Sequence, residues 1–196
     1  MAITPDGKTL YVAVAYLTGP SYVIPIATAA NTPGKPIRLE TIARDIVVTP
    51  DGKTAYAVGM LLTAGHETPK IVVTPIATAT NTPGKPISTG TTAYLSAPVV
   101  MTPDGQTIYI NEFSPNLVVP FSTGTNTPGK AIRFGAPAVT GIAITPDGRT
   151  AYAISSVGIP QNDVVGGHGD FFRCIGLPGA VTPMPLRRKR QLGGSV

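Results

Sequence analysis

The chain is poor in cysteine and has no long hydrophobic run. Its single cysteine, Cys174, excludes an intrachain disulfide and any metal site built from several cysteines. No apolar stretch approaches the roughly 20 residues that a membrane-spanning helix needs, so we expect no transmembrane segment. The GxSxG, HExxH, phosphate-loop and dinucleotide-binding motifs are also missing from the sequence, and we expect no cofactor.

Charge is scarce as well, at 13% of the residues. Four of the five units of net positive charge come from the run Arg187, Arg188, Lys189 and Arg190. The rest of the chain is close to neutral and offers no basic face for a phosphate backbone, so we expect no nucleic-acid partner. The 22 glycines and 21 prolines suit many short strands joined by tight turns. Composition therefore favours an all-β protein.

Two short motifs recur along the chain. The motif TPDG begins at Thr4, Thr49, Thr102 and Thr145, and the motif NTPGK begins at Asn31, Asn81 and Asn126. A repeat of about 45 residues with several short strands per unit is typical of β-propeller blades. We therefore predict an all-β fold, a partial or open β-propeller with about three and a half to four blades of four-stranded antiparallel sheet.

Each motif has the composition of a tight turn. In TPDG, proline presets φ, aspartate bonds nearby backbone amides, and glycine takes the positive φ that closes a bulged hairpin. In TPGK, the Pro-Gly pair predicts a type II turn. Pro25, Pro75 and Pro120 fall inside the third strand of their units, so we expect a bulge or a local irregularity there. The tyrosines at positions 11, 56, 109 and 152 are expected to pack between neighbouring blades.

Strand-like runs recur in a fixed order, labelled A to D, and divide the chain into units. The predicted blade units lie near residues 1–43, 44–96, 97–140 and 141–158, and the last of them reaches only its strand B. Residues 159–196 are expected to form an irregular basic tail with a candidate strand at 179–186.

The runs ITPDGKTLYVAV, VTPDGKTAYAVG and ITPDGRTAYAIS, with ATNTPGKPI closing a unit, resemble the YVTN family of β-propeller repeats. The resemblance covers residues 1 to about 158. It implies a secreted, periplasmic or cell-surface propeller of the YncE type, usually seven-bladed, and more distantly a lactonase-like or quinoprotein-like one. The repeat carries no catalytic residue that could be transferred. Met1 is followed at once by a TPDG motif, so no signal peptide is recognised and the sequence leaves the compartment open.

At about 45 residues per blade, the chain is too short for seven blades. Two copies would bring strands A and B against strands A and B instead of completing a shared blade. Three alternatives stay open, namely a truncated product, a compact four-bladed ring and an open array. An open array leaves inter-blade faces and strand edges uncovered, which predicts self-association through the open blade edges.

Irregular polar residues gather in the loops between strands B and C, on the face where propellers usually bind ligands. His66 and Glu67 are placed in one such loop, and Asn111 and Glu112 in the next. They are the candidate ligand-binding residues, with side chains of successive blades converging near the axis. The alternative is that these loops are polar because surface loops generally are. No metal-binding spacing is present, and no catalytic residue is predicted.

Repeats without chemistry favour a non-enzymatic scaffold. We expect it to bind an unidentified protein or small molecule on the loop face, or to act at the cell surface, either by itself or as a fragment of a larger seven-bladed propeller. The alternative is a remnant of a lactonase-like or quinoprotein-like enzyme. Acidic or histidine side chains that converge at the axis would favour the enzyme.

Overall fold

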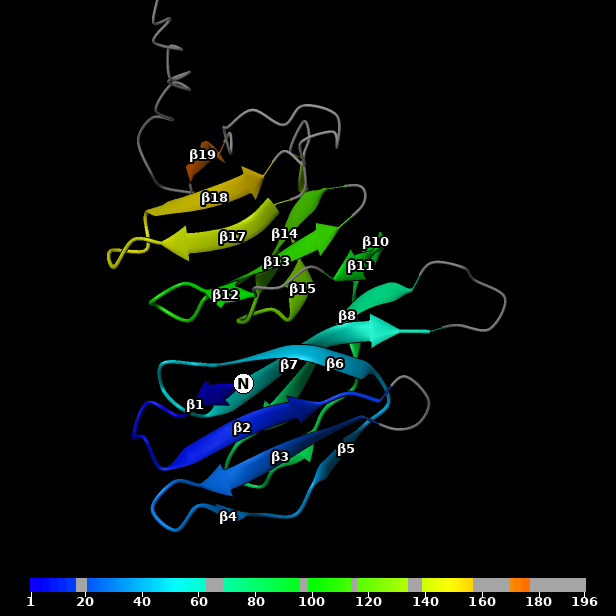
Figure 1. Cartoon of the computed structure of the whole chain (residues 1–196), viewed down its shortest axis with the longest axis vertical. Helices are drawn as coiled ribbons and strands as arrows, with labels where there is room; N and C mark the ends of the chain where they lie inside the picture. The colour runs from blue at the N-terminus through cyan, green and yellow to red at the C-terminus, as the bar shows by residue number, and fades with distance from the viewer. Residues whose placement is uncertain are drawn as a thin grey trace, which may run out of the picture.

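The computed structural model describes residues 1–16, 21–62, 69–95, 99–113, 116–133, 139–156 and 170–176. Every regular element in these ranges is a β-strand, and the strands form four antiparallel sheets (Figure 1). The all-β fold expected from composition is confirmed. None of the described ranges contains a helix that is long and apolar enough to cross a membrane.

Each sheet is built from one unit of the repeat, with its strands in chain order. The first sheet contains β1 (Ala2–Ile3), β2 (Thr9–Val14), β3 (Ser21–Ala27), β4 (Thr32–Pro33) and β5 (Ile37–Leu39). The second contains β6 (Ile42–Val48), β7 (Thr54–Leu61), β8 (Lys70–Ala77), β9 (Thr82–Pro83) and β10 (Ile87–Thr92). The third contains β11 (Tyr94–Leu95), β12 (Val100–Met101), β13 (Thr107–Phe113), β14 (Leu117–Ser122), β15 (Thr127–Pro128) and β16 (Ile132–Arg133). The fourth contains β17 (Val139–Ile144), β18 (Thr150–Ser156) and β19 (Asp170–Gly176).

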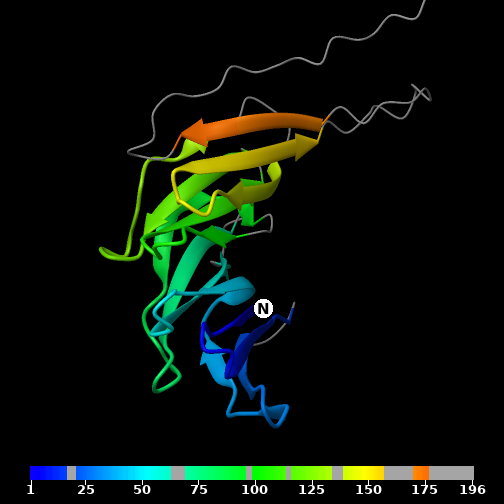
Figure 2. The same ribbon diagram turned by 90° about the vertical axis from the view of Figure 1, so that its left-hand side faces the viewer.

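The four sheets follow one another along the molecule as an open array. Figures 1 and 2 show the first sheet, in blue, at one end and the fourth, in yellow and orange, at the other. The chain therefore does not adopt the compact four-bladed ring that the sequence left open. Within each sheet, the two ends of the strands differ in the connections that they carry. We call the end with the TPDG and NTPGK turns the corner end, and the end where strand B finishes and strand C begins the loop end.

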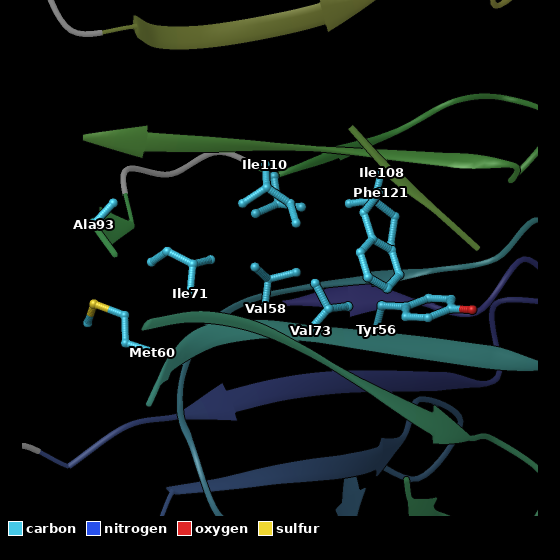
Figure 3. Close-up of a cluster of buried hydrophobic side chains, with 10 residues drawn as sticks. Tyr56, Val58, Met60, Ile71, Val73, Ala93, Ile108, Ile110 and Phe121 are labelled. Carbon is cyan, nitrogen blue, oxygen red and sulfur yellow. The ribbon is translucent and has the colours of Figure 1, made fainter. Parts of the chain in front are cut away.

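Apolar side chains fill the space between successive sheets. Figure 3 shows the second of these interfaces, in which side chains from β7 and β8 point toward side chains from β13 and β14. The rings of Tyr56 and Phe121 meet edge to face there, with centroids 6.3 Å apart. The first and third interfaces are built in the same way. Each sheet is thus held mainly by its neighbours in the array.

The repeated tyrosine is part of every interface. Tyr11, Tyr56 and Tyr109 are 1, 4 and 2% exposed, whereas Tyr152, on the last sheet, is 40% exposed. The expected packing of these rings between blades is confirmed for the three that have a following sheet. The hydroxyl of Tyr11 donates to Asn81 Oδ1 at 2.8 Å, and that of Tyr56 to Asn126 Oδ1 at 3.2 Å. Each bond joins one sheet to the NTPGK corner of the next.

The TPDG corners behave as the sequence predicted. In the first, Gly7 has a φ of 71°, the Thr4 hydroxyl donates to Asp6 Oδ1 at 2.7 Å, and the Lys8 amide donates to the same oxygen at 3.1 Å. These bonds hold the pKa of the Asp6 carboxyl below its ordinary value, so it stays ionised and keeps accepting both donors. The other three corners repeat the same contacts.

The corners also interlock from sheet to sheet. The TPDG proline of one sheet lies against the position where a side chain on the TPDG glycine of the next would be, as in the pairs Pro5 and Gly52, Pro50 and Gly105, and Pro103 and Gly148. A side chain on these glycines would be strained by their positive φ and would meet the proline ring of the preceding corner. Glycine therefore closes the turn at each corner, and at Gly105, where a Cβ would lie 2.6 Å from the Pro50 ring, it also makes room for the neighbouring sheet.

The NTPGK corner differs from its prediction as a type II turn with a positive-φ glycine. The positive φ belongs to the asparagine, with 49° at Asn31 and 54° at Asn81 and Asn126. The hairpin turn lies at residues 28–31 and ends at the asparagine of the motif, and Thr32 and Pro33 already pair with β3. Gly34 is needed for another reason, because a Cβ there would lie 3.2 Å from the Pro25 ring. Both asparagine and glycine can adopt a positive φ in turns, so the sequence alone did not show that the asparagine takes this conformation here.

The strand-C prolines are accommodated without a bulge toward strand B. Pro25 pairs with Tyr11 in a regular β2–β3 ladder, and the other two units keep the same register. The Pro25 carbonyl accepts a bond of 2.7 Å from the Gly34 amide, so the missing proline N–H also faces the outer strand. The outer strand is interrupted there into β4 and β5. The expected irregularity therefore lies in strand D.

The fourth unit continues beyond strand B. β19 pairs with β18 over the full length of both, from Thr150 opposite Gly176 to Ser156 opposite Asp170, and takes the position of strand C. This strand was not predicted, because residues 170–176 share no motif with the other C strands. The strand expected at 179–186 lies outside the described residues.

We predict that Gly84→Ala lowers the free energy of unfolding by about 1–2 kcal/mol, because the new Cβ would lie 3.1 Å from the Pro75 ring. Gly124→Ala is the matched control, since its Cβ would lie 3.6 Å from Gln106 Oε1 in ordinary contact. The control should change stability by less than about 0.5 kcal/mol. Denaturant titrations followed by circular dichroism compare the two. Equal effects would show that glycine is not selected at this corner by the proline ring.

Candidate functional site at the loop end of the second and third sheets

The structure describes two of the four predicted site residues. His66 and Glu67 lie outside the described residues. Asn111 and Glu112 are described, but they lie within β13 and not in a loop, and both are 0% exposed. β13 pairs with β14 as far as Glu112 opposite Leu117, and with β11 through Leu95 opposite Glu112. Their placement in a loop was therefore wrong, because two polar residues at a strand end were interpreted as the start of a turn.

Asn111 and Glu112 interrupt the apolar pattern of strand B. The same two positions, counted from the repeated tyrosine, hold Ala13-Val14, Val58-Gly59 and Ile154-Ser155 in the other units. A buried amide and a buried carboxyl in an interface of this kind cost free energy unless they find partners. The third sheet therefore departs from the repeat at its loop end.

The Glu112 carboxyl is held by the outer strand of the second sheet. Its Oε1 accepts hydrogen bonds from the hydroxyls of Thr91, at 2.7 Å, and Thr89, at 3.2 Å. These threonines flank Gly90, whose φ of 82° marks an irregularity in β10, where the register with β8 shifts between Ser88 and Thr92. The irregularity turns both hydroxyls toward Glu112. Glu112 Oε2 is buried and has no hydrogen-bond partner among the described residues.

Burial raises the pKa of the Glu112 carboxyl, and the two threonine hydroxyls only partly oppose this effect. A protonated carboxyl would place its proton on one oxygen and still accept both hydroxyls on the other. Burial therefore shifts this carboxyl toward its neutral form relative to a carboxyl in water.

Asn111 faces the opposite side of the same sheet. Its Nδ2 donates to the carbonyl of Val139, where β17 begins and where its register with β18 shifts. Its Oδ1 is buried without a hydrogen-bond partner among the described residues. Adjacent residues of a strand point to opposite faces, so Asn111 enters the third interface and Glu112 the second. The structure does not bring these two predicted ligand residues together.

Exposed apolar residues also occur at the loop end of the first three sheets. Four of the large hydrophobic side chains that solvent reaches in the described residues follow or end a strand at the loop end: Tyr16, Leu62, Tyr94 and Phe113, which are 54, 60, 51 and 51% exposed. Tyr94 and Phe113 lie directly opposite each other in the β11–β13 ladder. We call these four residues the loop-end apolar group. Sequence reasoning missed them because each continues an apolar strand B or stands in a strand-like run.

The corner end carries a shallow hollow of 340 Å³ between the first two sheets. Its lining includes Thr4, Asp6, Tyr11, Asp51 and Thr78. Asp6 and Asp51 already accept bonds from their own turns. The hollow is therefore a product of corner packing. Within the described ranges, no three His, Cys, Asp or Glu side chains gather into a group that could hold a metal ion.

Comparison with known proteins shows the fold. No protein-family model and no curated protein matches the chain. Among solved structures, Kuenenia stuttgartiensis hydrazine synthase has a TM-score of 0.69 at 20% identity, over 91% of this chain and 45% of that one. A functionally unknown protein from Desulfotomaculum acetoxidans has a TM-score of 0.61 at 16% identity, over 93% and 53%. TolB from Acinetobacter baumannii has a TM-score of 0.56 at 15% identity, over 94% and 43%.

Hydrazine synthase and TolB are similar to this chain in a β-propeller-type fold. The chain is therefore a partial, open β-propeller, as the repeat predicted. It spans about half the length of the solved structures that it matches. At these identities the likeness concerns the fold alone.

We predict that Glu112→Gln raises the melting temperature at pH 7. The raised pKa of folded Glu112 adds stability below about pH 4.5, the ordinary value, and this contribution is lost as the pH rises through the folded value. Glutamine keeps an acceptor for both threonines and carries no charge. Each kcal/mol gained in the free energy of unfolding would raise the melting temperature by about 2–4 °C.

Differential scanning calorimetry between pH 4 and pH 8 checks this expectation on the wild type and the variant. The melting temperature of the wild type should fall relative to that of the variant as the pH rises. Glu40→Gln, at an exposed position, is the control and should follow the wild type. A variant that melts below the wild type at pH 7 would mean that the buried carboxylate is stabilising.

Proposed function

We propose that this chain is a non-enzymatic β-propeller scaffold that binds a protein segment with aromatic side chains through the loop-end apolar group. The observation that carries the proposal is the exposure of Tyr94 and Phe113 side by side at the loop end, each 51% exposed. A cluster of large apolar residues that stays in water is a common mark of an interaction surface. Aromatic residues are also enriched in binding hot spots.

The repeated polar residues support a scaffold. Thr4 and Asp6, like their counterparts in the other sheets, are used to close a turn. Tyr11 and Asn81 are used to join two sheets, as are Tyr56 and Asn126. Since these side chains are committed to the architecture, function is left to positions where the units differ. The loop end of the second and third sheets is such a position.

Glu112 and Asn111 support the surface from below in this proposal. Glu112 fixes the bend of β10 that leads into β11, and so it sets where Tyr94 stands. Asn111 fixes the start of β17. His66 and Glu67 follow β7 and Leu62 in the chain, and we keep them as predicted ligand contacts. The membership of the YVTN family and the cell-surface role that the motifs suggest belong to the same proposal.

The enzyme alternative has less support from the described residues. A lactonase-like or quinoprotein-like activity would use acids or histidines that converge at the axis. Asn111 and Glu112 instead point into two different interfaces and make their bonds to neighbouring sheets. Glu112 is fully buried, so a substrate would have no access to it in this arrangement.

Phage-displayed linear peptides with and without aromatic residues test the binding surface. We expect aromatic peptides to be enriched on the immobilised chain. Fluorescence anisotropy with an enriched synthetic peptide should then show that the Tyr94→Ser/Phe113→Ser double variant binds at least about tenfold more weakly. Both side chains are half exposed, so the variant should keep its circular dichroism spectrum.

Ile3→Ser is the matched control, because it also removes an exposed apolar side chain, 54% exposed, but lies away from the loop end. It should leave peptide affinity unchanged. Equal enrichment of peptides without aromatic residues would contradict the proposed partner. Equal weakening by the control and the double variant would contradict the proposed surface.

A further inference from the structure

The three interfaces within the chain follow one rule. Every sheet has a trailing face, which carries the repeated tyrosine and meets the following sheet, and a leading face, which meets the preceding sheet. In the first interface, the trailing residues Tyr11 and Val23 pack on the leading residues Ile46, Ala55 and Ile76. The second and third interfaces use the corresponding positions. The array therefore adds sheets by stacking a trailing face on a leading face.

The leading face of the first sheet is apolar and uncovered. Leu10 and Val12 are only half-buried, whereas the residues at the same repeat positions in the second, third and fourth sheets are 0 or 1% exposed. Met1 and Ile3, on strand A of this sheet, are 80 and 54% exposed. Ile24 and Ile26 of β3 complete the face and are half-buried. These six residues have the character of a leading face without its preceding sheet.

Single contacts at the corners also indicate that the first sheet lacks a preceding sheet. A Cβ built on Gly52, Gly105 or Gly148 would meet the proline of the preceding corner within 3.5 Å, but a Cβ on Gly7 would meet no atom within 4 Å. Asn31 has the same positive φ as Asn81 and Asn126, which accept bonds from the tyrosines of the preceding sheets. Asn31 is exposed. The first sheet thus carries an acceptor and a gap that the repeat elsewhere fills.

The trailing face of the fourth sheet carries the matching groups. Tyr152 is 40% exposed, and Ala143, which pairs with it across the β17–β18 ladder, is exposed as well. Pro146 lies at the TPDG corner of this sheet and is exposed, as the three other TPDG prolines are. Tyr152 and Pro146 correspond to the tyrosine and the proline that contact the asparagine and the glycine of the next sheet elsewhere in the chain. Asn31 and Gly7 have no preceding sheet to supply these two contacts. One end of the array is complementary to the other.

We propose that two copies of this chain associate head to tail, with the fourth sheet of each stacked on the first sheet of the other. Tyr152 of one copy then donates to Asn31 of its partner, and Pro146 lies against Gly7, as Tyr11 does with Asn81 and Pro5 with Gly52 inside one chain. The occupant is a second copy because the interface continues one that the chain already makes three times.

The smallest closed assembly contains two copies, because each copy offers one leading face and one trailing face. A head-to-tail contact closes when the rotation allows it and otherwise grows into a filament. Closure by two copies forms the same interface twice, and each contact holds the partner in place for the other.

Sedimentation velocity on the full wild-type chain is the first test. We expect a single species of twice the chain mass of 20.2 kDa at micromolar concentration. Val12→Glu places a carboxylate on the leading face and Tyr152→Glu places one on the trailing face. Each variant alone should be monomeric, with self-association weakened by about a hundredfold, because an unpaired charge would be buried.

The mixture of the two variants is the decisive measurement. In a head-to-tail arrangement, the intact trailing face of Val12→Glu can still stack on the intact leading face of Tyr152→Glu, whereas the second contact of the pair would bring the two introduced carboxylates together. An equimolar mixture should therefore form a one-to-one dimer that is held by one interface and is weaker than the wild-type dimer. Misfolded variants could not do this. Leu62→Glu, at an exposed position of the loop end, is the control and should stay dimeric like the wild type.

A wild-type monomer, a filament, or a mixture that stays monomeric would overturn the proposal. Dimers of Tyr152→Glu alone would also overturn it, since they would mean that two leading faces meet each other. A monomer would point to further sheets of a longer chain as the natural cover of the first sheet. The measurement uses no peptide, so its failure would leave the proposed binding at the loop end standing.

Discussion

The structure depends on the burial of sheet faces against one another. A sheet in this chain is apolar on its two sides, so a single one would leave a large hydrophobic face in water. Stacking removes that face and replaces it with tight contacts such as that of Tyr56 with Phe121. Polar groups interact at the corner end, where the hydrogen bond between the Tyr11 hydroxyl and the Asn81 side chain favours one alignment of the two sheets. Hydrophobic burial supplies the stability, and the corners supply the register.

The repeat made the architecture predictable, but some of its details were hidden. Aspartate and glycine in TPDG act through local bonds and a local φ, so the sequence alone identifies their roles. Gly34 is required by a ring of another strand, Pro25, and a turn motif cannot reveal such a contact. β19 pairs by backbone bonds and carries no repeat motif. Contacts between distant segments therefore set the limit of what the pattern could show.

The candidate site shows the same limit in another form. Asn111 and Glu112 were selected as irregular polar residues of a loop, but polarity alone could not distinguish a surface loop from a buried bond to a neighbouring sheet. Thr89 and Thr91, which hold Glu112, stand in a short polar run that resembles any connecting loop. Exposure of Tyr94 and Phe113 depends on where neighbouring segments end. The burial, the hydrogen bonds and the exposure of these side chains thus depend on which sheets lie next to one another.

The proline content of the outer strands has a consequence for how such an array avoids polymerising through its edges. Strand D of the first sheet is broken into two short pieces, β4 and β5, and Pro33 and Pro36 leave two positions of this edge without an amide proton. Pro83 and Pro86 do the same in the second sheet. A foreign strand that approached this edge would find too few donors for a continuous ladder, which is how natural sheets resist fibril growth. Such a molecule can associate through its sheet faces without also forming strand pairs through its sheet edges.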